Sequence, residues 1–238
     1  MNFIISLNNS VSNKLTEKYN KPEFVVKQNI LLDKSFQIFE KQENFYAFSG
    51  KIYNKNEFSL NTENNAEFIS ELINKQGIEQ IKKIDGKYTI IIKEQEKYTI
   101  IIDRHGVNSQ VYYNENYIVS HQELFLEFDD FSPEPDINNI ALFLKIGYIP
   151  APQTALKKVY KLPAGYILSK NKDDFKIFEQ YPFDEFSHEE NKIKISVEEA
   201  TEQYMYLHRK ALENRIKDSK KVQILLSGGY DSGGNIML

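Results

Sequence analysis

Short runs of β-branched and aromatic residues recur along the first 181 residues, and they restrict this part of the chain to a strand-rich fold. Turns rich in Asn, Lys and Glu separate these runs, which are Phe3–Leu7, Phe36–Glu40, Phe45–Ile52, Tyr88–Lys93, Tyr98–Asp103, Gln110–Tyr113, Tyr117–Ser120, Gly165–Ser169 and Phe175–Phe178. Residues 87–92 and 97–102 are the same hexapeptide, KYTIII, with polar residues between them. This arrangement predicts a β-hairpin and does not indicate a repeat architecture.

Apolar residues at helical spacing predict three helices. The first carries Ala66, Phe68, Ile69, Leu72 and Ile73 and ends at Gly77, and the second carries Ile137, Ile140, Ala141 and Leu144 and ends at Gly147. The third runs from about residue 197 to 216, where Ser196 and Glu199 have the spacing of a capping box. We expect all three apolar stripes to pack into a core.

The last residues, 222–238, read VQILLSGGYDSGGNIML and predict a buried strand, a tight loop and a helix beginning near Ser232. Backbone N–H groups in such a loop and the positive end of the helix would face one point, which suits a phosphate group. Asp231 adds a carboxylate that could hold Mg²⁺. The alternative is an ordinary glycine-rich turn, and Gly233 and Gly234 would each cost the helix roughly 1 kcal/mol.

Composition excludes several kinds of site. The sequence has no cysteine, which rules out disulfides, a thiolate nucleophile and cysteine-ligated zinc, and its four histidines lack ligand spacing. A net charge of −4 and a pI near 5.7 argue against nucleic acid or an anionic membrane as a partner. No signal peptide and no apolar run of about 18 residues is present, so we expect a cytoplasmic protein.

A charged stretch poor in large aliphatic residues, 183–194, predicts a linker between two domains, 1–182 and 183–238. An ATP-binding domain needs on the order of 100–200 residues. The second domain should therefore be truncated, with only its beginning present.

Several motifs give the chain a resemblance to the asparagine synthetase family. Residues 227–232, SGGYDS, are similar to the S-G-G-x-D-S PP-loop of ATP pyrophosphatases, and four upstream segments resemble family landmarks in the right order: IDGKY at 84–88, DRHGV at 103–107, GYIPAPQT at 147–154 and KLPAG at 161–165. The resemblance implies an α+β fold: an Ntn-hydrolase-like αββα sandwich, as in class II glutaminase domains. The first strand–loop–helix of a Rossmann-like α/β PP-loop domain would follow.

The same resemblance shows where the chain departs from a working glutaminase. Asn2 stands where the family has its cysteine nucleophile, Ser49–Gly50 replaces the Asn–Gly oxyanion pair, and Asn65 replaces the aspartate that binds the glutamine amino group. These changes predict that glutamine hydrolysis is lost, as in the β-lactam synthetases and lasso-peptide cyclases that keep a degenerate glutaminase fold.

The leading hypothesis is an asparagine-synthetase-like, ATP-dependent ligase that adenylates a carboxylate, which an amine then attacks; the motifs specify neither substrate. The resemblance implies that Ser227, Gly228, Gly229 and Ser232 hold the pyrophosphate of ATP and that Asp231 places Mg²⁺. Alone, the chain should not complete the reaction. The alternative is a non-catalytic pseudo-glutaminase scaffold that docks onto a separate synthetase chain, and homo-oligomers and a truncated product also stay open.

Overall fold

The computed structural model describes residues 3–7, 18, 23–27, 29–171, 174–181, 194–217 and 219–237. The chain divides into two compact units: Met1–Ile52 with Asn56–Pro182, and Tyr53–Lys55 with Phe183–Leu238. The predicted linker lies outside the described residues except for Lys194, and so does Asn2. No helix among the described residues is long and apolar enough to cross a membrane.

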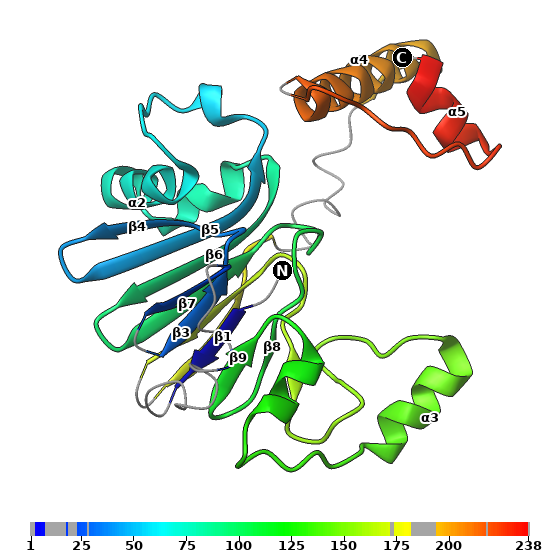
Figure 1. Ribbon diagram of the computed structural model, residues 1–238. Coiled ribbons are helices and arrows are strands. Elements are labelled where there is room, and N and C mark those ends of the chain that lie inside the picture. Colours follow the sequence, from blue (N-terminus) through cyan, green and yellow to red (C-terminus); the bar gives the residue numbers. More distant parts are fainter. Residues whose placement is uncertain are drawn as a thin grey trace. The chain divides into compact units, whose positions relative to one another are not determined.

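One six-stranded antiparallel sheet holds the longest strands of the first unit (Figure 1). Its order is β12 (Phe175–Glu179), β11 (Tyr166–Lys170), β7 (Lys97–Ile102), β6 (Gly86–Glu94), β5 (Asn44–Ile52) and β4 (Gln37–Lys41). The two KYTIII segments pair within β6 and β7, with Ile91 opposite Ile100, which confirms the predicted hairpin.

The second sheet is also six-stranded and antiparallel, with the order β10 (Tyr160–Lys161), β8 (Tyr112–Tyr113), β9 (Tyr117–Val119), β1 (Phe3–Ser6), β3 (Ile30–Asp33) and β2 (Phe24–Lys27). Every predicted run is a strand whose ends differ by at most two residues. Strands β2, β3 and β10 were not predicted, although they are as long as β1, β8 and β9, which were.

The core lies in layers because successive strand residues face opposite sides of a sheet. From β1, Phe3 and Ile5 enter the cluster between the two sheets, whereas Ile4 faces the outer cluster. Helix α2 (Asn65–Gln76) covers the outer face of the longer-stranded sheet and buries Phe68 and Leu72 there, next to the 3₁₀ segment η2 (Ile78–Lys83). Among the described residues, the outer face of the other sheet is covered by η3 (Gln122–Glu127) and adjoining loops. The α+β fold with two antiparallel sheets is therefore confirmed.

Helix α3 (Ile137–Ile146) forms as predicted, with Gly147 in the left-handed conformation at its C-terminus. The expectation that its apolar stripe packs into the core is wrong, since Ile137 is 69% exposed and Leu144 is 79% exposed. The helix lies in the long segment that connects η3 to β10, away from both sheets (Figure 1). An apolar stripe shows that a helix has a face to bury, but it does not specify the surface that buries it.

The second unit contains α4 (Val197–Ile216) and α5 (Tyr230–Met237). The capping box of Ser196 and Glu199 is confirmed, but no residue of α4 is buried. The predicted buried strand at 222–226 is wrong, because this segment has no strand pairing and Leu225 is 92% exposed. A strand needs a neighbouring backbone for its N–H and C=O groups, and the described residues of this unit provide none. Helix α5 begins at Tyr230, two residues before the predicted start, and includes both glycines.

Candidate functional site

One end of the two sheets gathers residues that the motif resemblance assigned to a glutaminase-like site. Strand β1 begins here, and the N–H of Phe3 donates a hydrogen bond to Oγ of Ser120 over 3.0 Å. Oγ of Ser120 lies 2.9 Å from Nδ1 of His121. Asn2, which the resemblance assigns to the nucleophile position, lies outside the described residues.

Ser49 and Gly50 lie on β5 at the same end. The Ser49 side chain is buried, with its Oγ 3.2 Å from Oγ of Ser35, and its carbonyl accepts a hydrogen bond of 3.0 Å from Nδ2 of Asn108. Gly50 has a φ of +125°, and a Cβ there would lie 2.0 Å from the carbonyl oxygen of Lys87. A hydroxyl offers one donor where an amide offers two, so Ser49 has less capacity to stabilise an oxyanion.

Asn65 is the first residue of α2, and its N–H donates to Oε1 of Gln37 over 2.8 Å. Gln37 is paired with Phe48 in the β4–β5 register, so Asn65 lies beside the stretch of β5 that carries Ser49. The structure thus brings Ser49, Gly50 and Asn65 to one end of the sheet. A neutral amide at position 65 offers no negative charge to a substrate ammonium group.

The side chain of Asp103 holds together the loop at this end of the two sheets. Its carboxylate is buried and accepts hydrogen bonds from the backbone N–H groups of Tyr88, His105, Val107 and Asn108, at 3.0–3.3 Å. The side chain of Asn108 then bridges to Oγ1 of Thr89 at 3.1 Å and to the carbonyl of Ser49. Asp103 therefore acts as a structural residue that positions Asn108.

A pocket of about 380 Å³ opens between this loop and the end of β9. Gly106 to Gln110 line one side of it, and Ser120 and His121 line the other. Asn108 and His121 were not predicted as site residues. Asn108 has no spacing signal, since its partners Ser49 and Thr89 come from distant strands. Among the described residues, the side chain of His121 lies within hydrogen-bonding distance of its neighbour Ser120, and the link from Ser120 to Phe3 spans 117 positions.

In the second unit, Ser227 and Ser232 lie together across a tight loop. Their Oγ atoms are 3.1 Å apart, and the N–H of Ser227 donates to Oγ of Ser232 over 3.3 Å. Gly228 has a φ of +77°, and the N–H of Gly229 donates to Oγ of Ser227. Oγ of Ser232 donates to the carbonyl of Gly229 over 3.2 Å, so its hydroxyl would have to turn to donate to a phosphate oxygen.

The neighbouring Asp231 and Tyr230 are exposed. No group of three His, Cys, Asp or Glu residues that could hold a metal occurs in the described part of the chain. A Mg²⁺ ion at Asp231 would therefore take most of its oxygen ligands from phosphate groups and water, which is a common arrangement for this ion.

Comparison with known proteins supplies a family for the first unit. A family model described as a glutamine amidotransferase domain matches residues 32–182. The putative asparagine synthetase [glutamine-hydrolyzing] 2 of Methanocaldococcus jannaschii is 29% identical over 199 residues, which cover 78% of this chain and 38% of that protein.

Two solved structures also match, each at 14% sequence identity and over 76% of this chain. One is the glutamine phosphoribosylpyrophosphate amidotransferase of B. subtilis complexed with ADP and GMP, with a TM-score of 0.40 and 42% of its chain covered. The other is described as the allosteric regulatory enzyme of purine biosynthesis, with a TM-score of 0.42 and 43% covered. The chain thus spans less than half the length of each of these proteins.

Proposed function

The chain belongs to the glutamine amidotransferase domain family, and on this basis we propose that it is part of an asparagine-synthetase-like, ATP-dependent amide-forming ligase that no longer hydrolyses glutamine. The observation that carries the loss of hydrolysis is the placement of Asn65 beside the stretch of β5 that carries Ser49, with the Ser49 carbonyl bound by Asn108 of the pocket that Ser120 also lines. Hydrolysis needs a strong oxyanion donor and an ammonium-binding carboxylate at such positions.

The available nucleophiles also support the proposed loss of hydrolysis. No thiolate can form, because the sequence has no cysteine. The Ser120 hydroxyl lies 2.9 Å from Nδ1 of His121, but Ser120 is 2% exposed and its Oγ already accepts the N–H of Phe3.

We assign ATP to the loop of Ser227, Gly228, Gly229, Asp231 and Ser232. In the proposed reaction, a carboxylate oxygen attacks the α-phosphorus of ATP and pyrophosphate leaves; an amine then attacks the acyl carbon and AMP leaves. The Ser227 and Ser232 hydroxyls would bind oxygens of the departing pyrophosphate. Asp231 would help to bind a Mg²⁺ ion that offsets the negative charge of the pyrophosphate. Residues outside this chain would complete the pocket.

A second candidate is a pseudo-glutaminase scaffold that docks onto a separate synthetase chain. The observation that favours it is the exposed apolar segment of residues 222–226, in which Leu225 and Leu226 are 92% and 64% exposed. An unpaired apolar segment of this kind can add a strand to a partner's sheet. We propose a cytoplasmic location for the protein, whether it acts as a ligase or as a scaffold.

ATP–pyrophosphate exchange by the intact native protein, with a library of carboxylates, tests the ligase proposal. We expect carboxylate-dependent exchange that falls about 100-fold in Ser232→Ala, a loss typical of a removed transition-state donor, while Ser219→Ala is unchanged. Exchange that requires a second, separately encoded chain would favour the scaffold. If the exchange rate is unchanged in Ser232→Ala, the assignment of ATP to this loop is contradicted.

A further inference from the structure

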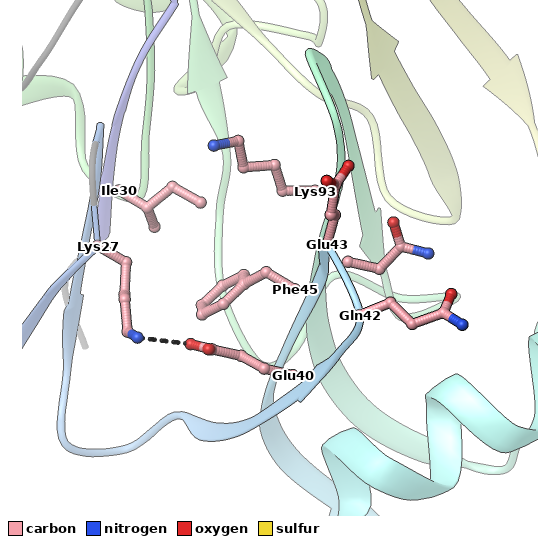
Figure 2. Close-up of a pocket in the computed structure, with 8 residues that line it drawn as sticks. Lys27, Ile30, Glu40, Gln42, Glu43, Phe45 and Lys93 are labelled. Atoms are coloured by element: carbon pink, nitrogen blue, oxygen red, sulfur yellow. Dashed lines mark ion pairs between the residues drawn. The ribbon is translucent and has the colours of Figure 1, made fainter.

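Polar contacts between elements play a different part in each unit. In the first unit, Nζ of Lys27 on β2 and Oε1 of Glu40 on β4 form an ion pair of 2.8 Å, beside the buried side chains of Ile30 and Phe45 (Figure 2). Both charged side chains are about half exposed, so such a pair adds little to the core between the sheets. In the second unit no residue of α4 is buried, and a polar contact between the helices has no such core to supplement. There, the position of one helix against the other depends on that contact.

Helix α5 needs such a contact more than α4 does. It spans eight residues, fewer than the roughly 12–15 that an isolated helix needs in water, and it includes Gly233 and Gly234. Glycine is the weakest helix former after proline, and nothing packs within 4 Å of a Cβ placed at either position. The 20 residues of α4, in contrast, begin at a capping box. Helix α4 is therefore the firmer of the two, and α5 depends on what holds it.

A hydrogen bond between side chains joins the two helices. Nε2 of His208, in the middle of α4, lies 2.8 Å from Oδ1 of Asn235 in α5. With the amide oxygen as the acceptor, Nε2 carries the proton and donates the hydrogen bond. The centre of the Tyr204 ring, one turn earlier on α4, lies 5.6 Å from the centre of the imidazole ring and restricts its rotation. His208 is thus held by its own helix while it binds the other.

Asn235 lies one turn after Ser232 on the same face of α5, because residues three apart in a helix are neighbours. Both are half-buried, whereas the residues on either side of Asn235 are exposed. Ser232 in turn bonds the loop, since its Oγ accepts from the N–H of Ser227 over 3.3 Å and donates to the carbonyl of Gly229 over 3.2 Å. A continuous set of contacts therefore runs from His208 through the first turn of α5 to the loop.

We propose that His208 is a positioning residue for the loop of residues 227–232: through Asn235 it fixes the first turn of α5, and so the direction in which Ser232 and the loop N–H groups face the phosphates of ATP. The inference rests on the proposed assignment of ATP to this loop. His208 acts through Asn235 and needs no contact with the nucleotide. Neither residue belongs to the S-G-G-x-D-S motif, so the motif does not supply this role.

Amide hydrogen exchange of the intact native protein tests whether the contact holds α5. His208→Ala should speed exchange of the amides at residues 233–236 about fivefold, since it removes one hydrogen bond of ordinary strength. Asn235→Ala should speed it as well, although alanine is the better helix former. His208→Gln, whose amide N–H can donate from nearly the same place, should restore the rate to within about twofold. The matched control is Tyr206→Ala, which removes a ring of α4 that is 65% exposed and should leave the rate unchanged.

ATP–pyrophosphate exchange by the same variants tests the positioning itself. His208→Ala should raise the KM for ATP about fivefold and change kcat less, because a loop that is free to turn binds the phosphates more weakly. His208→Gln should recover most of the KM, and Tyr206→Ala should match the unmodified protein. A role in folding alone would lower the active fraction, and therefore the apparent kcat, and would leave the KM unchanged.

The inference is overturned if His208→Ala leaves the KM for ATP unchanged while the unmodified protein catalyses the exchange, a result that leaves the ATP assignment intact. Unchanged hydrogen exchange in both alanine variants would also overturn it, because other contacts would then hold α5. Absence of pyrophosphate exchange from the unmodified protein contradicts the ATP assignment, and the inference with it. If His208→Ala fails to fold, Asn235→Ala decides the question from the other side of the same hydrogen bond.

Discussion

Asp103 holds the loop beside the candidate site in place, although its own side chain does not line the pocket there. Four backbone N–H groups depend on its buried carboxylate. Asp103→Ala should lower the free energy of unfolding by about 3 kcal/mol, because it leaves buried donors without an acceptor. Urea denaturation measures this, with the exposed Asp129→Ala as control. A loss no larger than that of the control would show that the loop holds its shape without Asp103.

Gly50 and Gly147 both have positive φ angles but differ in the space around them. A Cβ at Gly50 would overlap the backbone of Lys87, whereas nothing lies within 4 Å of a Cβ at Gly147. Gly50→Ala should therefore cost at least about 3 kcal/mol and separate β5 from β6. Gly147→Ala should cost about 1–2 kcal/mol, which is the cost of the left-handed conformation alone. Equal losses in thermal or urea unfolding would refute the steric argument.

At the residue scale, motif resemblance predicted Ser49, Gly50 and Asn65 as site positions, because each falls within a short segment of recognisable order; the structure brings the three together, and their role stays a prediction. It could not predict Asn108 or His121. The hydrogen bond from Asn108 to Ser49 spans 59 positions in the sequence, and no local pattern encodes such a contact. The backbone partners of Asp103 are mostly local, since His105, Val107 and Asn108 follow it within five positions.

For the helices and strands, local sequence signals predicted that an element exists and where it begins and ends better than they predicted whether it is buried. Ser196 and Glu199 correctly marked the start of α4, and Gly77 and Gly147 correctly marked the ends of α2 and α3. The environments of α3, α4 and residues 222–226 were predicted wrongly, because burial depends on a neighbouring surface. Leu225 is a large apolar residue of the kind found in core strands, but it is almost fully exposed.

Since none of its residues is buried, α4 should depend strongly on its cap. Oγ of Ser196 accepts from the N–H of Glu199 at 3.1 Å, and Oε2 of Glu199 accepts from the N–H of Ser196 at 2.9 Å. Ser196→Ala should cost about 1 kcal/mol and speed hydrogen exchange of the first-turn amides by about fivefold. Thr201→Ala, which removes only an internal side-chain bond to the carbonyl of Val197, is the matched control. If both variants exchange at the same rate, the cap does not hold the helix.

For the whole molecule, the pattern of β-runs was sufficient to predict a strand-rich first unit, and the family match over residues 32–182 agrees with it. The assignment of 183–238 to the beginning of an ATP-binding domain stays a prediction, since its described residues form α4 and α5 and no strand. A parallel sheet is built from strands distant in sequence, so a single apolar segment cannot show its partners.

The central claim is that this molecule keeps a glutamine amidotransferase fold without its chemistry. Ammonia release from glutamine by the purified intact protein tests it most directly, alongside the variant Asn2→Cys/Ser49→Asn/Asn65→Asp as a reference that restores three of the altered positions. We predict no release above background from the unmodified protein and measurable release from the variant once Met1 is removed. Steady, glutamine-dependent ammonia release by the unmodified protein would contradict the claim.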